Sequence, residues 1–166
     1  MLLKNERTTL PLSADRARRL AVVGPNANGT LVLQGNYQGV APFLTSPLAG
    51  LGRFAEQVDY SVGCDVAGGS GGAADGGIAA AVALARRPST DAVVIVVGLN
   101  QSQESEGLDR AEIGLPGLQD LLIARVAAAA DGKPVVLVVI AGGSVDLSAA
   151  KHNPAIGAIV WAGYGG

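Results

Sequence analysis

Cysteine and histidine are almost missing from this sequence. It contains one cysteine, Cys64, and one histidine, His152. A single cysteine excludes a disulfide bond within the chain, and a single histidine excludes a metal site built from clustered histidines. We predict that Cys64 packs in the core, as free cysteines usually do, and that His152 lies at the surface before a turn at Asn153–Pro154.

The sequence also lacks a large excess of charge of either sign and lacks long apolar runs. Twelve basic and fourteen acidic residues give a net charge of −2, and there is no long basic run. The longest apolar runs fall short of the roughly 20 residues that span a bilayer. The N-terminal stretch "MLLKNERTTLPLS" lacks the apolar segment of a signal peptide. This balance favours neither nucleic acid nor a membrane as a partner.

What the sequence does contain is a regular alternation of apolar runs and helical segments. Continuous runs rich in valine and isoleucine are typical of strands that are covered on both faces. Five strands are predicted at residues 19–25, 57–63, 91–99, 133–143 and 156–164, and helices at 46–55, 76–87, 116–132 and 145–152. The pattern predicts one domain over residues 1–166, a layered α/β/α sandwich with a mainly parallel sheet of about five strands.

A glycine-rich stretch, "GGSGGAADGG" at residues 68–77, invites comparison with a phosphate-binding loop. It lacks the Lys-Ser/Thr ending of that motif, and no G-x-G-x-x-G follows the first predicted strand. We interpret the stretch as a flexible surface loop. A nucleotide-binding domain is therefore disfavoured, and neither a cofactor nor a metal is expected.

Carboxylates follow the most apolar strand, in "DAVVIVVGLNQSQESEGLDR" at residues 91–110. Glu104 and Glu106 lie in the loop after this strand, ahead of an Asp109–Arg110 pair. Ligands of parallel sheets bind beyond the carboxyl ends of the strands, so this loop is a candidate site. From composition alone, the favoured interpretation is that both glutamates are solvated loop residues without a chemical role.

Several motifs in a fixed order resemble glycoside hydrolase family 3. They are "LLKNERTTLPLS", "LAVVGPNAN", "GNYQG", "TSPLAGL", "VGLNQSQESEGLDR", "LPGLQDLLIARVA" and "KPVVLVVIAGGSVDLSAAKHNPAIGAIVWAGY". Each motif is weak alone, but the ordered combination is specific. The chain most resembles the plant-type β-xylosidases and α-L-arabinofuranosidases of that family, and it is similar to their C-terminal α/β sandwich domain.

The resemblance implies a site shared between two domains. A barrel domain carries an aspartate nucleophile, and the α/β domain supplies an acid/base glutamate on a loop. Retaining glycosidases need two carboxyl groups about 5 to 5.5 Å apart, one as nucleophile and one as general acid and base. By its offset from Gly98, Glu104 best matches the acid/base position, and Glu106 is the second choice. We expect Asp109 and Arg110 to brace the loop as an ion pair.

The partners implied are a xylo-oligosaccharide or related β-glycoside and a barrel domain that these residues do not contain. No nucleophile motif surrounds the aspartates at positions 15, 59, 65, 75, 91 and 146. We therefore expect the chain alone to be inactive, and the face that meets a barrel to expose apolar side chains. Asn100 and Gln101 are candidates for contacts with sugar hydroxyls.

Other interpretations remain open at this point. The chain could be a non-catalytic module that binds carbohydrate or protein. Plant members of the family often carry a second cysteine shortly after the one that matches Cys64, and "GCDVAGGSGG" has none, so a stabilising bridge is predicted to be missing. Family members are mostly secreted or found in the cell wall, yet no signal peptide is evident, so localisation stays open. Sugar specificity is also open.

Overall fold

Six strands form one mostly parallel sheet in the computed structural model, which describes residues 1–68 and 74–165. In chain order the strands are β1 Leu2–Asn5, β2 Arg19–Val23, β3 Gln57–Ser61, β4 Ala92–Gly98, β5 Val135–Ile140 and β6 Ala158–Trp161. Their order across the sheet is β1-β6-β5-β4-β2-β3. All neighbours pair in parallel except β1 and β6, which are antiparallel.

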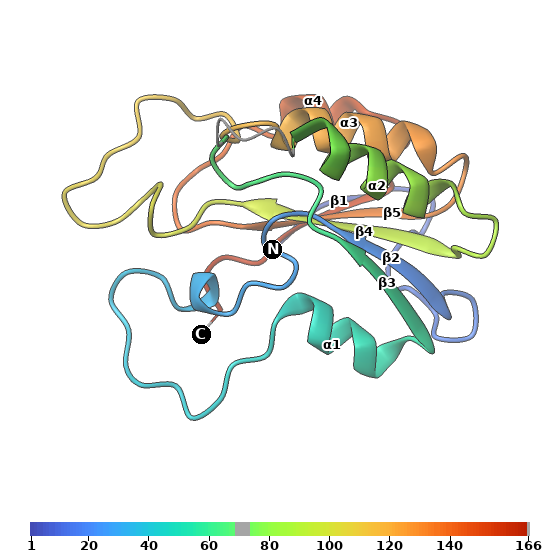
Figure 1. Cartoon of the computed structure of the whole chain (residues 1–166), viewed down its shortest axis with the longest axis horizontal. Coiled ribbons are helices and arrows are strands. Elements are labelled where there is room, and N and C mark those ends of the chain that lie inside the picture. Colours follow the sequence, from blue (N-terminus) through green and yellow to red (C-terminus); the bar gives the residue numbers. More distant parts are fainter. Residues whose placement is uncertain (69–73, 166) are drawn as a thin grey trace.

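Helices cover both faces of this sheet, which confirms the predicted layered α/β/α architecture. The helices are α1 Pro47–Phe54, α2 Ala74–Arg86, α3 Gln119–Ala129 and α4 Ser148–His152, with a short 3₁₀ helix, η1, at Leu31–Gln34. Figure 1 shows α1 on one face and α2, α3 and α4 on the other. The predicted start of α3 at position 116 was three residues early, because Gly117 adopts a left-handed conformation with φ +65° before the helix begins.

The central strand β4 explains why the apolar runs are continuous. Every residue of Ala92–Gly98 is buried. Val93, Ile95 and Val97 pack under α2 and α3, and Val94 and Val96 pack on the α1 side. Because side chains alternate along a strand, a sheet with two covered faces needs apolar residues at every position.

The prediction of about five strands missed β1. The short segment Leu2–Asn5 adds to the edge of the sheet beside β6, with Asn5 opposite Ala158. The N-terminal ammonium group donates a hydrogen bond to the Trp161 carbonyl oxygen at 2.7 Å. Four residues give too short a pattern to predict a strand, and pairing with the far end of the chain decides this one.

Two single-residue predictions agree with the structure. Cys64 is buried and joins the core under α2 and α3. His152 is exposed at the end of α4, and its Nδ1 lies 2.8 Å from the Ser148 carbonyl oxygen. Of the glycine-rich stretch at residues 68–77 that was predicted as a loop, residues 69–73 lie outside the described residues. Residues 74–77 form the start of α2, so the loop prediction was wrong for this part. Among the helices described, none is both long and apolar enough to cross a bilayer.

Candidate functional site at the carboxyl end of the sheet

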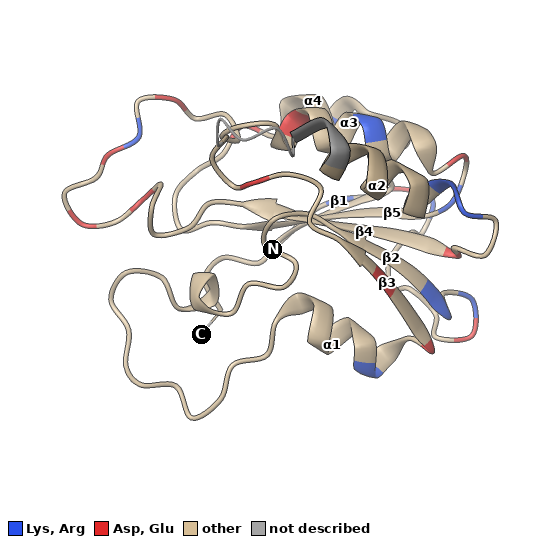
Figure 2. Cartoon of the chain, viewed as in Figure 1, with Lys and Arg blue, Asp and Glu red and all other residues tan. Residues whose placement is uncertain are grey.

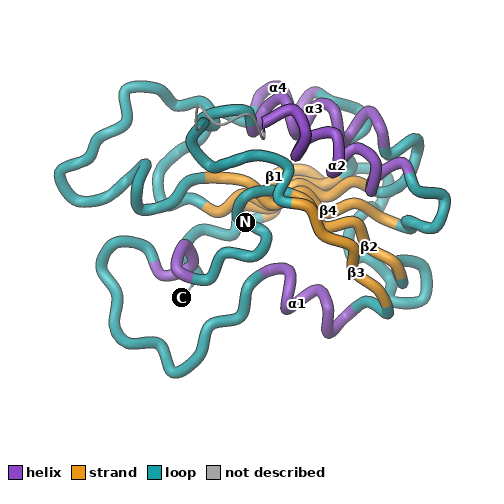
Figure 3. The backbone as a smooth tube through the Cα atoms, viewed as in Figure 1, coloured by secondary structure: helices purple, strands orange, loops and turns teal. Residues whose placement is uncertain are grey.

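The long connections of the molecule gather at the carboxyl end of the parallel strands. Figure 3 shows two extended loops reaching away from the sheet at this end. One spans residues 35–46 after β2 and η1, and the other spans residues 99–118 between β4 and α3. Ligands of parallel sheets bind at this end, because loops there are free to vary while the sheet stays fixed.

The acidic loop leaves the sheet at a tightly fixed point. Gly98 closes β4 with φ +140°, and a Cβ at this position would lie 1.9 Å from the Ile140 carbonyl oxygen. The fully buried Gln119 side chain accepts a hydrogen bond from Gly98 N–H and donates one to the Gly98 carbonyl, each at 2.8 Å. The same amide donates to the Val66 carbonyl at 2.8 Å. Gln119 therefore fixes the start of the loop.

The next residues turn the loop toward the segment after β2. Asn100 Oδ1 accepts hydrogen bonds from the backbone N–H and hydroxyl of Ser102, at 2.9 and 2.6 Å. Gln101 donates to the carbonyls of Leu31 and Gly35, at 3.2 and 2.9 Å. The Gln101 amide thus ties two loops together, and the structure shows a positioning contact where the sequence suggested a sugar contact.

Glu104 is anchored in a socket formed by two other segments. Its Oε1 accepts a hydrogen bond from Gly142 N–H at 2.6 Å, and its Oε2 accepts one from Gly143 N–H at 2.9 Å. The Tyr164 hydroxyl also donates to Oε1. We call these three donors the Glu104 socket. Both carboxylate oxygens are occupied, so this side chain is held by the fold.

Glu106 has a different environment only two residues away. Its side chain is exposed on the outer part of the loop, next to an isolated bridge between Ser105 and Leu108. The Glu106 carboxylate interacts with the hydroxyl of Tyr37, which raises the pKa of Tyr37 together with a smaller effect of desolvation. Glu106 therefore faces solvent beside an aromatic residue of the other long loop.

Arg110 braces the acidic loop, but by other contacts than predicted. Its guanidinium donates to the carbonyls of Ser144, Glu112 and Gly114, at 3.2, 2.8 and 3.0 Å. Within residues 1–68 and 74–165, the ion pairs are Lys4–Glu6, Arg18–Glu56 and Arg87–Asp59. The predicted Asp109–Arg110 pair is not among them, because the loop carbonyls surround the guanidinium instead.

The second long loop differs from the acidic loop in charge and polarity. Residues 20–52 contain no charged side chain, and Figure 2 shows the contrast with the acidic residues of the loop after β4. Large apolar side chains are exposed along it, namely Tyr37 at 77%, Phe43 at 78% and Val40, and Leu31 is exposed on η1 just before it. A hollow of about 470 Å³ lies between the segment after β2, at residues 25–32, and the start of the acidic loop, lined in part by Asn26, Leu31 and Asn100.

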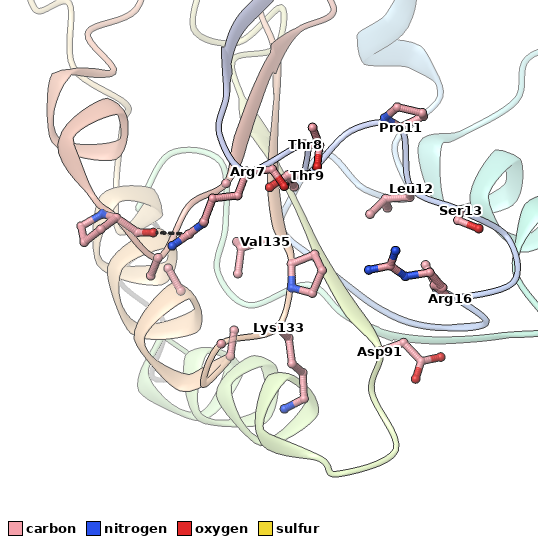
Figure 4. Close-up of a pocket in the computed structure, with 18 residues that line it drawn as sticks. Arg7, Thr8, Thr9, Pro11, Leu12, Ser13, Arg16, Asp91, Lys133 and Val135 are labelled. Atoms are coloured by element: carbon pink, nitrogen blue, oxygen red, sulfur yellow. Dashed lines mark hydrogen bonds between the residues drawn. The ribbon is translucent and has the colours of Figure 1, made fainter.

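A larger cavity lies at the opposite, amino end of the sheet (Figure 4). It measures about 700 Å³, and charged side chains on its walls include Arg7, Arg16, Lys133 and Asp91. Three of these are bonded to backbone: Arg7 to the Pro154 carbonyl, Lys133 to the Ala85 carbonyl, and Asp91 to the N–H of Arg19. It offers one carboxylate, so it lacks the pair that glycoside hydrolysis requires.

Several aspartates without a nucleophile motif have structural partners. Asp59 pairs with Arg87 at 2.9 Å. Asp146 accepts a hydrogen bond from Ser148 N–H at 2.8 Å, and the hydrogen bonds from Ser148 lower the pKa of Asp146. Desolvation, with a smaller contribution from Asp146, raises the pKa of Asp120 at the start of α3. Bound in this way, Asp59 and Asp146 support the fold.

The residues that hold Glu104 were not predicted from the sequence. Gly142, Gly143 and Tyr164 lie 38, 39 and 60 positions away from it along the chain. The "GG" after the β5 run was the one available signal, since paired glycines at a strand end often allow close approach of another group. Tyr37 and Gln119 had no signal that set them apart from other loop and helix residues.

Comparisons with known proteins agree with this arrangement. Residues 1–166 match the family described as the glycosyl hydrolase family 3 C-terminal domain. The whole chain is 48% identical to beta-D-xylosidase 3 of Arabidopsis thaliana and 46% identical to beta-xylosidase/alpha-L-arabinofuranosidase 1 of Medicago sativa subsp. varia. In both cases it covers 20% of the relative's length. The chain therefore spans about a fifth of the curated relatives that it matches.

Solved structures show the same similarity in three dimensions. An exo-β-xylosidase of family 3, in complex with a xylobiose aziridine activity-based probe, superposes with a TM-score of 0.88 at 40% identity. The match covers 99% of this chain and 20% of that one. A β-glucosidase from Erythrobacter marinus gives a TM-score of 0.81 at 30% identity, over 99% of this chain and 25% of that one.

Proposed function

The chain belongs to glycosyl hydrolase family 3, as the C-terminal α/β domain of that family, and from this premise we propose that its loop after β4 supplies a general acid and base for glycoside hydrolysis. The domain is related to β-xylosidases of plants and fungi. The proposed reaction is retaining hydrolysis of terminal β-xylosyl residues, with arabinosyl or glucosyl residues as variants. The main observation in support of this proposal is that two glutamates of one loop lie at the carboxyl end of the sheet in different environments. Glu104 is held by hydrogen bonds, and Glu106 is exposed.

We assign the proton-transfer role to Glu106, which reverses the order that the sequence favoured. A general acid must present a protonated oxygen to the glycosidic oxygen, and later accept a proton from water. Both oxygens of Glu104 already accept hydrogen bonds from the socket. Glu106 is exposed, so its carboxylate is accessible to a substrate.

The nucleophile is proposed to come from a partner domain that is not among these residues. Retaining chemistry needs a second carboxyl group about 5 to 5.5 Å from the first. The relatives are about five times longer than this chain, which leaves room in them for such a domain. The exposed apolar side chains of Leu31, Val40 and Phe43 beside the acidic loop support a surface that a partner covers.

The chemistry of the second loop supports an uncharged sugar as the substrate. Residues 20–52 offer no charge that would need a counter-ion on the ligand. Tyr37 and Phe43 present aromatic faces, and aromatic rings provide rigid apolar surface for the C–H face of a sugar. The choice among xylose, arabinose and glucose would then depend on the partner domain.

The test uses a chimera in which residues 1–166 replace the matching fifth of the Medicago enzyme. We expect Glu106→Gln to lower kcat/KM for xylobiose by ~10²- to 10⁴-fold. Glycosylation by 2,4-dinitrophenyl β-xyloside should be affected little, because its leaving group needs no proton. Azide should then accelerate turnover by replacing water in the second step, where the general base is missing.

The chain alone provides the matching control. We expect no hydrolysis of either substrate by residues 1–166 without a partner domain. Hydrolysis by the isolated chain would contradict the two-domain proposal. Full activity of the Glu106→Gln chimera on xylobiose would contradict the assignment of Glu106. Weak binding of xylobiose that does not require the proposed catalytic residues, together with no hydrolysis by any chimera, would favour a carbohydrate-binding module.

A further inference from the structure

We infer that Glu104 is a positioning residue, which docks the acidic loop into its socket and thereby sets the place of Glu106. This inference rests on the proposed function. It assigns a task to the carboxylate that the proposed chemistry leaves unused. The two glutamates would then form one unit, in which one side chain anchors the loop and the other transfers the proton.

The socket is built for a carboxylate. Its donors are two consecutive backbone N–H groups and one hydroxyl, and they surround both oxygens of Glu104. A carboxylate is the side chain that accepts at both ends without donating. In Glu104→Gln, the amide nitrogen would face an N–H donor, so one hydrogen bond becomes a donor–donor contact.

The two glycines are part of the same fit. A Cβ on Gly143 would lie 2.8 Å from Glu104 Oε2, and a Cβ on Gly142 would lie 2.9 Å from the Tyr164 ring and 3.2 Å from Glu104 Oε1. Any side chain at these positions would therefore push the carboxylate or the tyrosine out of place. The close approach of Glu104 to the backbone requires the absence of both Cβ atoms.

The socket connects four segments at the carboxyl end of the sheet. Glu104 lies on the loop after β4, Gly142 and Gly143 follow β5, and Tyr164 follows β6. The Tyr164 ring in turn packs against Gly35, where a Cβ would be 3.0 Å from it, and Gln101 donates to the Gly35 carbonyl. Gly35 begins the loop that carries Tyr37. The socket thus connects the loop that carries Glu106 with the loop that carries Tyr37.

Tyr164 is suited to remain a donor in this arrangement. Burial and the hydrogen bond to Glu104 raise the pKa of the Tyr164 phenol well above its usual range. The hydroxyl therefore stays protonated at any pH at which a glycosidase works. Tyr164→Phe removes one of the three donors and leaves both N–H donors in place, so it is a milder change than Glu104→Gln.

The experiment compares Glu104→Gln, Tyr164→Phe and Glu106→Gln in the chimera described above. A displaced catalytic group can cost ~10²-fold in rate. We expect Glu104→Gln to lower kcat for xylobiose by about 10- to 100-fold, and Tyr164→Phe to lower it less. In both variants, the pH profile of activity should keep the limb that reports ionisation of the general acid. Azide should not accelerate turnover by either variant. Glu106→Gln should lose that limb and respond to azide.

A second measurement uses residues 1–166 alone. Amide hydrogen exchange should become faster at residues 99–110 and 35–43 in Glu104→Gln, and should stay unchanged there in Glu106→Gln. Equal exchange in Glu104→Gln and the parent chain would overturn the positioning role. This readout does not depend on turnover, so it also applies if a chimera is inactive.

The kinetic outcomes separate the two proposals. If Glu106→Gln behaves as a lost acid while Glu104→Gln retains full activity, the positioning role is wrong and the proposed function stands. If Glu104→Gln loses the pH limb and gains azide acceleration while Glu106→Gln does neither, Glu104 is itself the acid, and both the socket's role and the Glu106 assignment are wrong.

Discussion

The two ends of the sheet differ in how their charged groups are used. At the amino end, a cavity of about 700 Å³ carries more charged side chains, yet three of them are bonded to backbone groups of the surrounding segments. At the carboxyl end, the hollow is smaller, about 470 Å³, and residues 100–102 of the acidic loop form part of its wall. The same loop carries the exposed carboxylate of Glu106 and is held in place by other residues.

This difference shows why cavity size alone does not locate a site. Parallel strands all end on the same side, so loops of different origin meet there and can combine their side chains. Connections at the amino end mainly return helices to the sheet, and their polar groups satisfy the backbone at those junctions. In this chain the proposed function falls at the end of the sheet where an exposed carboxylate, Glu106, remains.

The largest expected effect tests how firmly the sheet fixes the acidic loop. Gly98→Ala would place a Cβ 1.9 Å from a backbone oxygen, so the strands β4 and β5 would have to separate locally. We expect the free energy of unfolding to fall by about 4 kcal/mol or more. Gly107→Ala is the matched control, since Gly107 also has positive φ but open space around it, and should cost only about 1 kcal/mol. Urea unfolding followed by circular dichroism measures both.

A somewhat smaller effect on stability is expected from Gln119, whose side chain fixes Gly98 at the point where the loop leaves β4. Gln119→Leu removes hydrogen bonds to both backbone groups of Gly98, which are buried, and to the partly buried Val66 carbonyl. Unsatisfied buried groups cost about 1 to 3 kcal/mol each. We expect a loss of about 3 kcal/mol in urea unfolding. A loss below about 1 kcal/mol would mean that the loop start is fixed by the strand alone.

Cys64, which follows β3 at the carboxyl end, should make stability depend on alkaline pH. Desolvation and then Asp65 raise the pKa of its thiol to about 11, against about 8.5 in an unfolded chain. Above the lower value the unfolded state ionises first, so the free energy of unfolding should fall between about pH 8.5 and 11. The expected fall is about 3 kcal/mol, because each pKa unit corresponds to about 1.4 kcal/mol. In Cys64→Ser, this part of the pH dependence of the free energy of unfolding should vanish. The part that comes from tyrosines and lysines should remain.

The smallest effect is expected at the amino end. Arg16 is exposed on the wall of the larger cavity (Figure 4), so Arg16→Gln should change the free energy of unfolding by less than about 0.5 kcal/mol. Activity of the chimera on xylobiose should also stay within about twofold of the parent. A clear loss of activity would mean that the amino end contributes to function, and the contrast between the two ends would fail.

Local pattern was a good guide to the sheet and a poor guide to its edge. All five predicted runs became strands. The valine- and isoleucine-rich runs of β4 and β5 are apolar at every position because they lie between two helix layers, whereas β3 at the edge of the sheet is partly exposed. β1 has only four residues, two of them exposed leucines, and becomes a strand by pairing with β6. No local pattern records a partner that lies more than 150 residues away along the chain.

For the candidate site, the sequence predicted the location better than the roles. A polar loop after the most apolar strand led to Glu104 and Glu106, and both lie at the carboxyl end of the sheet as expected. Their offset from Gly98 favoured Glu104, but offset carries no information about hydrogen-bond partners. The socket consists of two backbone N–H groups and a distant tyrosine, and these approach Glu104 only in the folded chain.

The sequence by itself determined the layered α/β architecture, the family and the loop that carries the carboxylates, because apolar periodicity and ordered motifs are local properties. The tertiary structure alone decided which carboxylate is held and which is free, that Arg110 binds carbonyls, and that β1 completes the sheet. The physical reason is that burial and hydrogen bonding of a side chain depend on segments far away in sequence. Two glutamates with nearly the same sequence context thus acquire different chemistry only when the chain folds.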